Sequence, residues 1–376
     1  MENEPIRIAQ IMGKWLGGGV EAVIMNYYRN IDKSKIQFDF ICDSDSTDIP
    51  YEEIEALGGR VILCPPYQKL FKYVKELKRV FKKNNYKIVH SNINTLSVFP
   101  LYAAKKAGVP VRIAHSHSTI INNKKEWKRN FIKNILKHFS KIYATDCLAC
   151  SDMAAVTQFG EKSFNDGKVK IIYNAIELKK FEYNKSIRKS KRKEFNIKDD
   201  AIVIGHVGRF ADTKNHDFLI DVFNKYHKIN SNSILVLAGQ GKILNEIKNK
   251  AKKLALDKYV YFIGQRNDIN EIYQLFDIFM LPSLYEGLGM ALIEAQISGL
   301  PCITSTVVPK ITKVIENFSF LDLNESIDSW VNKIIEYTNC KRSNCIDIFE
   351  NTRFNIYKES KKLEELYINR VGEIDD

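Results

Sequence analysis

Along most of this sequence, short apolar runs alternate with longer amphipathic stretches, and this alternation restricts the possible folds more than any other feature. The short runs have the length and apolar content of buried strands. The stretches between them, of roughly 10–15 residues, have the periodicity of helices. Strands that alternate with helices form βαβ units, whose strands lie parallel in one sheet. The sequence therefore predicts an α/β fold with doubly wound parallel sheets.

The alternation occurs as two series, separated by a charged, proline-free stretch after residue 176. In the first series we expect strands at residues 6–13, 38–43, 60–65, 87–92, 111–117 and 146–151. In the second we expect strands at residues 201–209, 233–241, 259–265, 277–283 and 301–305. A last helix, at about residues 355–371, has no strand after it and is free to pack back across the domains. A chain of 376 residues suits two such cores. We predict one domain at residues 1–175 together with the C-terminal helix, about 355–376, and a second at residues 176–354.

The composition is typical of a globular protein. Hydrophobic residues make up 45% of the chain and charged residues 27%, which argues against extensive disorder. The first apolar run is short and follows two acidic residues, so we expect a strand there rather than a signal peptide or a spanning helix. The seven cysteines are odd in number and lack a framework spacing. Reduced thiols and a cytoplasmic location are the simplest account.

The net charge of +12 is concentrated in basic segments. Residues 69–83 and residues 124–141 each hold seven Lys or Arg against one Glu, beside aromatic and aliphatic residues. A solvated helix face is one interpretation. The other is peripheral attachment to the anionic inner face of the cell membrane. No nucleic-acid-binding motif accompanies the charge, so we expect no nucleic-acid partner.

Two loops that follow predicted strands carry residues suited to an anion. Gly17, Gly18 and Gly19 come after the first strand and open a helix, whose N-terminus favours a phosphate. Their spacing is not that of the dinucleotide fingerprint, and a tight turn is the alternative. Arg209 and Lys214 follow the first strand of the second series, where they offer a forked donor and a point charge to phosphate oxygens. Two surface cations in a loop are the alternative there.

Two glutamates, Glu286 and Glu294, stand eight positions apart around a Gly-x-Gly turn that opens an apolar helix. Carboxylates accept paired hydrogen bonds from neighbouring hydroxyl groups, so sugar rings are natural ligands. Because the rest of the helix is apolar, we expect Glu294 to be a buried carboxylate with a partner. An Asp-x-Asp spacing occurs at Asp43 and Asp45, in the first series and away from these glutamates. We therefore expect neither a metal ion nor another cofactor.

The Glu-x7-Glu segment resembles that of glycosyltransferase family 4, which comprises retaining enzymes of GT-B architecture, with two Rossmann-like domains facing a cleft. The resemblance extends over nearly the whole chain. The Gly-Gly loop with Glu21, a histidine-containing strand end, Gly-Arg…Lys and Glu-x7-Glu occur in the order typical of the family. The chain is most similar to the branch that builds capsules, exopolysaccharides and related surface glycans. It departs from the family pattern at Ala175, Glu177 and Lys310, outside these motifs.

The resemblance implies how the diphosphate of a nucleotide-sugar donor would be bound. Arg209 and Lys214 would hold it and stabilise it as it leaves. The backbone amides of Leu288 and Gly289 would lie close to the sugar or the phosphate, and Gly18 would let the phosphates lie against the first domain.

The resemblance also implies which residues would bind the sugars and the base of the donor. Glu294 would bind the ribose hydroxyls, and Glu286, a candidate catalytic residue, would bind the transferred sugar near its 3- and 4-hydroxyls. The loop with Gln265 and Arg266 would hold the base, mostly through its backbone.

A histidine at the end of the strand at residues 111–117 would face the reacting centre. His115 and His117 are both candidates because they share strand parity. We favour His117, which lies nearer the carboxyl end of the strand.

These roles describe a retaining glycosyltransferase. It would move a hexose or N-acetylhexosamine from a nucleotide-diphosphate sugar, a UDP-sugar above all, to a glycan or lipid-linked acceptor. No carboxylate matches an enzyme nucleophile, so we favour attack on the face that the diphosphate leaves, with the departing phosphate as base. The alternatives are a nucleotide-sugar epimerase of the same architecture and a non-catalytic partner subunit of a transferase.

Overall fold

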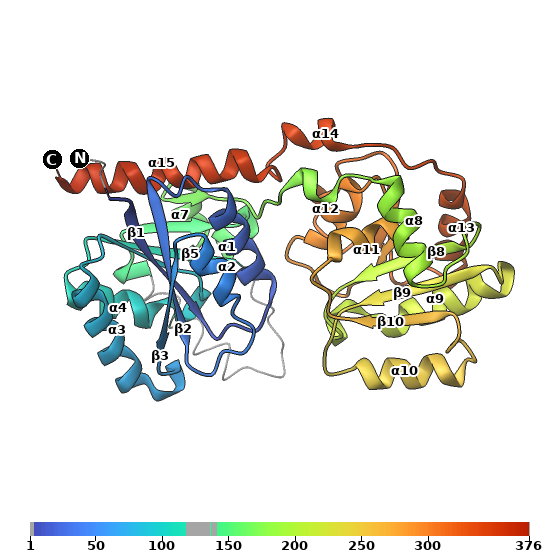
Figure 1. Ribbon diagram of the computed structural model, residues 1–376, viewed down its shortest axis with the longest axis horizontal. Coiled ribbons are helices and arrows are strands. Elements are labelled where there is room, and N and C mark those ends of the chain that lie inside the picture. Colours follow the sequence, from blue (N-terminus) through green and yellow to red (C-terminus); the bar gives the residue numbers. More distant parts are fainter. Residues whose placement is uncertain (1–3, 118–135, 137–140, 376) are drawn as a thin grey trace. The chain divides into compact units, whose positions relative to one another are not determined.

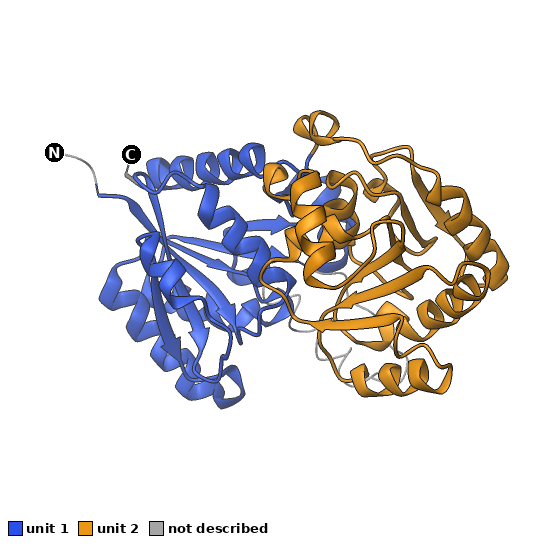
Figure 2. Ribbon diagram, turned by 45° about the vertical axis from the view of Figure 1, so that its right-hand side comes forward, with its two compact units in different colours: residues 1–176, 353–376 blue, residues 177–352 orange. Residues whose placement is uncertain are grey.

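The computed structural model describes residues 4–117, 136 and 141–375, which form two compact units (Figure 2). Unit 1 comprises residues 1–176 and 353–376, and unit 2 comprises residues 177–352. The chain thus passes from one unit to the other after residue 176 and returns after residue 352. The predicted domains end at residues 175 and 354.

Unit 1 is built on a seven-stranded parallel sheet with the order β3-β2-β1-β4-β5-β6-β7 (Figure 1). Its strands are β1 (Ile6–Gly13), β2 (Ile36–Asp43), β3 (Arg60–Cys64), β4 (Ile88–Ser91), β5 (Val111–Ser116), β6 (Asp146–Ala149) and β7 (Val169–Ile171). The strand order reverses between β1 and β4. In open α/β sheets, ligands bind beyond the carboxyl ends of the strands at such a switch point.

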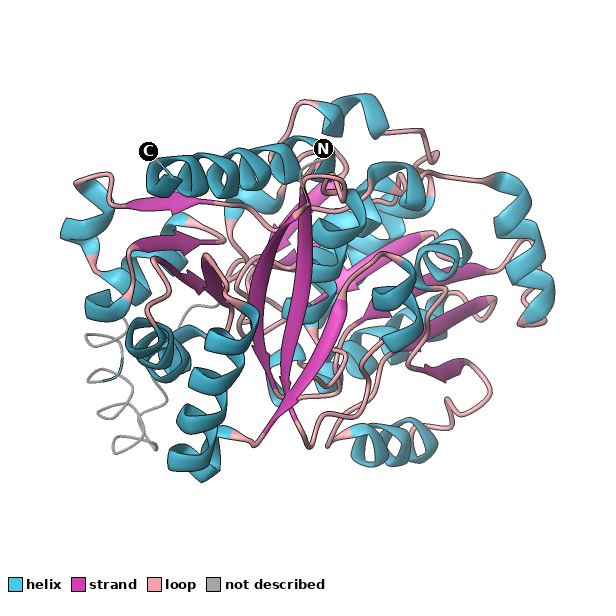
Figure 3. Cartoon of the chain, turned by 60° about the vertical axis from the view of Figure 1, so that its left-hand side comes forward, coloured by secondary structure: helices cyan, strands magenta, loops and turns pink. Residues whose placement is uncertain are grey.

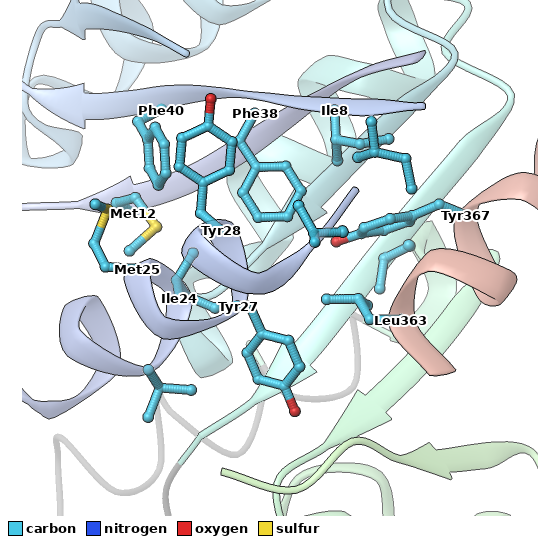
Figure 4. Close-up of a cluster of buried hydrophobic side chains, with 14 of the residues drawn as sticks. Ile8, Met12, Ile24, Met25, Tyr27, Tyr28, Phe38, Phe40, Leu363 and Tyr367 are labelled. Carbon is cyan, nitrogen blue, oxygen red and sulfur yellow. The ribbon is translucent and has the colours of Figure 1, made fainter. Parts of the chain in front are cut away.

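Helices cover both faces of this sheet. The described helices are α1 (Gly19–Asn30), α2 (Tyr51–Ala56), α3 (Leu70–Asn84), α4 (Val98–Ala107), α6 (Asp152–Phe159), α7 (Glu161–Asn165) and α15 (Ile356–Asp375). On one face, α1 and α15 pack against β1 and β2 (Figure 4). There Tyr28 of α1 stacks on Phe38 of β2, with 5.0 Å between ring centroids. On the other face, α3, α4 and α6 contribute to a second apolar cluster.

The C-terminal helix α15 belongs to the first of these cores. Its residues Leu363, Tyr367 and Val371 are spaced four apart, so they lie on one side of the helix, and all three are buried. Tyr367 meets Phe38 edge-on, with 6.1 Å between ring centroids. Complete burial of one such apolar side chain stabilises a fold by about 1.5–3 kcal/mol. The prediction that the last helix returns to the first domain is confirmed.

Unit 2 has a six-stranded parallel sheet with the order β10-β9-β8-β11-β12-β13. In both units, helices lie beside the strands of the sheet (Figure 3). Its strands are β8 (Ile202–Val207), β9 (Ser233–Ala238), β10 (Val260–Gly264), β11 (Ile278–Leu281), β12 (Cys302–Ser305) and β13 (Phe318–Leu321). Its longer helices are α8 (Lys185–Glu194), α9 (His216–Ile229), α10 (Leu244–Lys253), α11 (Ile269–Leu275), α12 (Met290–Ile297), α13 (Ile327–Thr338) and α14 (Ile346–Glu350). The order reverses between β8 and β11, as it does between β1 and β4. The predicted α/β class with two doubly wound sheets is confirmed.

Several strands begin or end a few residues from their expected bounds, and three differences matter for the fold or the site. β7 and β13 were not expected, because runs of three and four residues are too short for periodicity to distinguish. β5 ends at Ser116, so His117 follows the strand instead of closing it, which corrects the expected range of 111–117.

Among the helices that the structure describes, none combines the length and the apolar composition needed to cross a bilayer.

The basic segment at residues 69–83 forms most of α3, and its apolar side faces the core. Tyr73, Leu77 and Val80 are buried, whereas Phe71 is 93% exposed. The lysines lie on the exposed side. We expected basic and apolar residues together on one outer surface of this helix, and the exposed part of that surface consists of the basic side chains and Phe71. The second basic segment, 124–141, lies outside the described residues except at positions 136 and 141.

Candidate active site

In unit 2, two loops meet at the switch point of the sheet. One follows β8 and contains Arg209 and Lys214, and the other follows β11 and contains Glu286. The backbone N–H of Leu284 donates to the carbonyl of Thr213 at 2.8 Å, which ties the two loops together. The strands thus bring together residues that are more than seventy positions apart in the chain.

Lys214 and Glu286 form an ion pair within this junction. The Lys214 ammonium donates to Glu286 Oε1, and the hydroxyl of Ser283 donates to the same oxygen at 2.9 Å. The Glu286 side chain is 10% exposed and that of Lys214 21% exposed. A buried carboxylate needs such partners, because an uncompensated charge is costly there. Lys214 therefore positions Glu286 and balances its charge.

Arg209 has a different environment. Its side chain is exposed and forms no ion pair with any residue that the structure describes. The backbone around it is fixed, because Gly208 N–H donates to Ala238 O at 3.0 Å and Phe210 N–H donates to Gln240 O at 2.8 Å. The guanidinium is thus a free forked donor on a fixed loop, as an oxyanion ligand requires.

Behind Arg209, the backbone at Gly239 approaches the backbone at Gly208 so closely that only glycine fits. Gly239 has φ +136°, and a Cβ there would lie 2.1 Å from the carbonyl oxygen of Gly208. A side chain at this position would therefore push the Arg209 loop away from β9.

Glu294 lies on α12 and is half-buried. Tyr273 of α11 donates its hydroxyl to Glu294 Oε2 at 2.7 Å. Burial raises the pKa of the Glu294 carboxyl to about 7, although the Tyr273 hydrogen bond and the charge of Lys180 oppose the shift. The expected partner is confirmed, and the acid is less enclosed than expected. Its second oxygen is available to accept hydrogen bonds from a ligand.

The turn before α12 leaves backbone donors unused. Gly289 has φ +76° and precedes the first residue of the helix, a conformation that favours glycine. Thr312 donates its hydroxyl to the Leu288 carbonyl at 2.7 Å, which fixes the turn. Within the described parts of the chain, the amides of Leu288 and Gly289 donate to no residue. Unused amides at a helix N-terminus favour an anion.

The loop after β10 holds the residues predicted to contact the base. Arg266 donates to both carboxylate oxygens of Asp268, at 2.7 and 2.6 Å, and approaches Glu194 at 3.4 Å. The Arg266 side chain therefore already pairs with acidic neighbours within unit 2. Gln265 is exposed. This geometry leaves the backbone of the loop as the stronger candidate for contacts with a base.

In unit 1, the glycine loop leads directly into α1. Gly18 is the residue before the helix, and the Glu21 side chain folds back so that Leu16 N–H donates to its Oε1 at 3.2 Å. A Cβ on Gly18 would lie 2.9 Å from Glu21 Oε2. Glu21 therefore stabilises the loop from within, and Gly18 leaves it room to do so.

His115 and His117 lie side by side, with ring centroids 3.9 Å apart, which confirms their predicted parity. His117 Nε2 lies 3.0 Å from Asn92 Oδ1, and its backbone N–H donates to Asn94 Oδ1 at 2.8 Å. His115 Nδ1 lies 3.0 Å from His90 Nε2. All three histidines are buried. The two asparagines, which follow β4, hold the His117 ring and backbone.

The proton positions in this network follow from its amide donors. Asn92 Nδ2 donates to Gln10 Oε1 at 2.9 Å, so Asn92 Oδ1 must accept the proton on His117 Nε2. Gln10 Nε2 donates in turn to the hydroxyl of Tyr367 on α15, also at 2.9 Å. His117 is therefore protonated on Nε2 and carries a lone pair on Nδ1, which has no partner among the described residues.

The second branch of the network starts at the same tyrosine. Tyr367 already accepts from Gln10, so its own proton goes to His90 Nδ1, 2.6 Å away. His90 then donates from Nε2 to His115 Nδ1, which leaves an N–H on His115 Nε2. Burial lowers the pKa of His90 to about 3 and that of His117 to about 4, and also lowers the pKa of His115. All three rings are therefore neutral at physiological pH.

Sequence reasoning missed the residues that support the predicted ones. They are Tyr273 and Ser283 in unit 2 and Gln10, His90, Asn92 and Tyr367 in unit 1. A signal was available for His90 and Asn92, because polar residues at the carboxyl end of an apolar strand are unusual unless partnered. No comparable signal marks Tyr367, which is 357 positions from Gln10.

Comparisons with known proteins identify the family of the chain. The profile described as Glycosyltransferase Family 4 matches residues 17–180, and that described as Glycosyl transferases group 1 matches residues 187–359. The chain is 34% identical to the putative glycosyltransferase EpsF of Bacillus subtilis, over 89% of this chain and 88% of that one.

Two further proteins are similar over nearly their whole length. The UDP-Gal:alpha-D-GlcNAc-diphosphoundecaprenol alpha-1,3-galactosyltransferase of Escherichia coli is 27% identical over 98% of both chains. The crystal structure of Anabaena HepE in complex with UDP and glucose has a TM-score of 0.79 at 18% identity, covering 96% of this chain and 99% of that one. The two family profiles and the similarity to EpsF show that the chain belongs to glycosyltransferase family 4.

Proposed function

We propose that this enzyme transfers a hexose or N-acetylhexosamine, with retention, from a UDP-sugar to a glycan or lipid-linked saccharide in the synthesis of a surface polysaccharide. The observation that carries the proposal is the group of donors and acceptors at the switch point of unit 2. Arg209 and the amides of Leu288 and Gly289 offer free donors to a diphosphate. Glu286 and Glu294 offer carboxylate oxygens to hydroxyl groups.

The donor and the acceptor class are supported by the similar proteins. The name of the E. coli relative contains a UDP-sugar donor and a diphosphoundecaprenol acceptor, and the HepE structure contains UDP and glucose. The exposed lysines of α3 add support for an enzyme that works on the cytoplasmic face of an anionic membrane.

The chain's own cations suit a metal-independent reaction. Arg209 would stabilise the charge that develops on the departing diphosphate, and Lys214 would share its ammonium between the phosphate and Glu286. Glu286 would orient the transferred sugar through its hydroxyls. A fixed site of this kind stabilises the transition state without reorganising during the reaction.

His117 and His115 would act as neutral hydrogen-bonding groups. The lone pair on His117 Nδ1 would accept a hydrogen bond from a hydroxyl group, and the N–H on His115 Nε2 would donate one to an oxygen. With both rings neutral, the departing phosphate remains the base for the incoming hydroxyl, and substitution on one face retains the configuration.

The test begins with binding and continues with product analysis. A thermal-shift screen of nucleotide diphosphates should show the largest stabilisation with UDP. Radiolabelled UDP-sugars incubated with lipid-linked saccharides should then yield a product whose new bond has the anomeric configuration of the donor, and excess EDTA should not change the rate. Arg209→Ala should abolish transfer, and Lys242→Ala, which removes an exposed cation paired with Asp212, serves as its control.

Three outcomes contradict the proposal. Conversion of the UDP-sugar to its epimer without transfer would indicate an epimerase. Binding without any turnover would indicate a partner subunit. Loss of transfer in EDTA that magnesium or manganese restores would exclude the metal-independent mechanism.

A further inference from the structure

A cavity of about 240 Å³ lies at the switch point of unit 1, where Glu21 of the glycine loop forms part of its lining. It is lined by the ends of three strands, with Gly13 at the end of β1, Asp43 at the end of β2 and Asn92 directly after β4. Tyr67 lines another part of it. Pockets for drug-sized ligands measure roughly 300–1,000 Å³, so this volume suits a single small ring.

Asp43 is the unusual member of this lining. It is 1% exposed, and neither carboxylate oxygen has a hydrogen-bond partner among the residues that the structure describes. The nearby cation Lys14 pairs instead with Asp45, at 2.7 Å. Burial and the charge of Asp45 raise the pKa of Asp43 to about 6, although the backbone N–H of Tyr67 and the charge of Lys14 oppose the shift, so the group is largely ionised at neutral pH. The Tyr67 backbone N–H faces this carboxylate without forming a well-aligned hydrogen bond, and none of the described side chains donates to it. A buried carboxylate with so few donors is costly, which indicates that a ligand supplies the others.

The cavity adjoins the histidine network. Asn92 and Asn94 both line it, and the same two side chains hold His117 through its ring and its backbone. A ligand in the cavity would therefore lie beside the residues that fix the His117 imidazole. The sheet places Asp43 and His117 on the same carboxyl edge, from β2 and β5.

We propose that this cavity binds one neutral, hydroxyl-rich sugar ring of the acceptor, with the Asp43 carboxylate accepting hydrogen bonds from its hydroxyl groups. This inference rests on the proposed glycosyltransferase function and adds the chemical class of the ring that the acceptor presents. A carboxylate can only accept hydrogen bonds, and sugar hydroxyls supply the donors. Half-buried Tyr67 offers an aromatic wall to the apolar side of the ring.

The same charge sets the specificity of the cavity. A uronic acid or a phosphate brought to a buried carboxylate would meet a like charge in a poorly solvated site, which is strongly unfavourable. The lipid diphosphate of an acceptor would therefore lie outside the cavity, with its neutral sugar inside.

The proposal can be tested by saturation-transfer NMR with simple glycosides. The neutral probes are the methyl glycosides of glucose, galactose and N-acetylglucosamine, and the anionic probes are methyl glucuronide and inorganic phosphate. We expect at least one neutral glycoside to bind the wild-type enzyme and its Kd to rise at least tenfold in Asp43→Asn. Asp48→Asn is the matched control, because Asp48 is exposed on the same loop and does not line the cavity.

A stability measurement separates a ligand-binding role from a structural one. Since Asp43→Asn removes a buried unpaired charge, its melting temperature should equal or exceed that of the wild type. A decrease of more than about 5 °C would make Asp43 a structural residue and overturn the proposal. Equal glycoside binding in wild type and Asp43→Asn, or displacement of the glycoside by methyl glucuronide or phosphate, would also overturn it.

The two levels of the proposal fail in different ways. If the wild type binds UDP and no neutral glycoside, the acceptor inference fails and the transferase function stands. If it binds no nucleotide diphosphate, the proposed function itself fails.

Discussion

The parallel sheets of units 1 and 2 reverse their strand order at the corresponding point and carry polar residues there, yet the chemistry at the two edges differs. The edge of unit 2 is charged, with Arg209, the Lys214–Glu286 pair and Glu294. The edge of unit 1 consists mainly of neutral histidine, asparagine, glutamine and tyrosine side chains joined by hydrogen bonds. The fold thus fixes where a ligand binds, and the residues at that edge decide whether the site binds charge or orients neutral groups.

The largest effect should follow from removing charge in unit 2. Arg209→Ala and Glu294→Ala should each weaken UDP binding by about 1.5–3 kcal/mol, the range of a charged hydrogen bond. Isothermal titration calorimetry measures this directly. Lys242→Ala should retain the wild-type affinity, and unchanged affinity in both site variants would refute the assignment.

A neutral substitution in unit 1 should instead affect stability. Tyr367→Phe leaves Gln10 Nε2 and His90 Nδ1 without their shared partner, which should lower the free energy of unfolding by about 1–3 kcal/mol. Urea denaturation measures the change, with Tyr357→Phe, an exposed tyrosine on the same helix, as the control. UDP affinity should stay within twofold of wild type. A Tyr367→Phe protein as stable as its control would show that the network is not structural.

The pH dependence of donor binding should distinguish the two edges. Glu294, with a pKa of about 7 and with Tyr273 and Lys180 facing it, accepts hydrogen bonds from hydroxyl groups best when ionised. UDP-glucose affinity should therefore fall by up to about tenfold from pH 8 to pH 6, and Glu294→Gln should remove this change. The histidines of unit 1 stay neutral over this range. A pH dependence that persists in Glu294→Gln would assign it to another group.

The same shift affects stability with a defined sign. The folded-state pKa of Glu294 lies above its value in the unfolded chain, so the folded protein holds more protons between about pH 4.5 and 7. The contribution of this group to stability is therefore complete below that window and decreases as the pH rises through it.

The smallest effect concerns the exposed surface. If the basic side of α3 attaches unit 1 to membranes, Lys75→Ala should weaken binding to anionic liposomes by about 1 kcal/mol or less. Lys252→Ala, on the exposed surface of unit 2, is the control. Sedimentation should show binding that falls steeply with salt. Equal binding to neutral vesicles, or none to anionic ones at low salt, would exclude electrostatic attachment.

Much of the donor site could be predicted because its residues occupy short segments. Glu286 and Glu294 share one loop and helix, and Arg209 and Lys214 share another. The supporting residues could not be predicted in the same way. Tyr273, the partner of Glu294, lies on a helix whose apolar spacing gives no reason to single it out. The cavity around Asp43 was likewise missed, since its walls come from three strands.

By itself, the sequence determined the α/β class, the two series of strands and the local motifs, because helix and strand periodicity and loop spacing are properties of neighbouring residues. The tertiary structure decided which of these residues are bonded to one another. In the folded chain, Lys214 forms an ion pair with Glu286, whereas Arg209 has no ion pair among the described residues. Gln10 donates to Tyr367, which lies almost a whole chain length away in the sequence. Such contacts depend on strand order and on the return of α15, and burial then sets the charge state of each group.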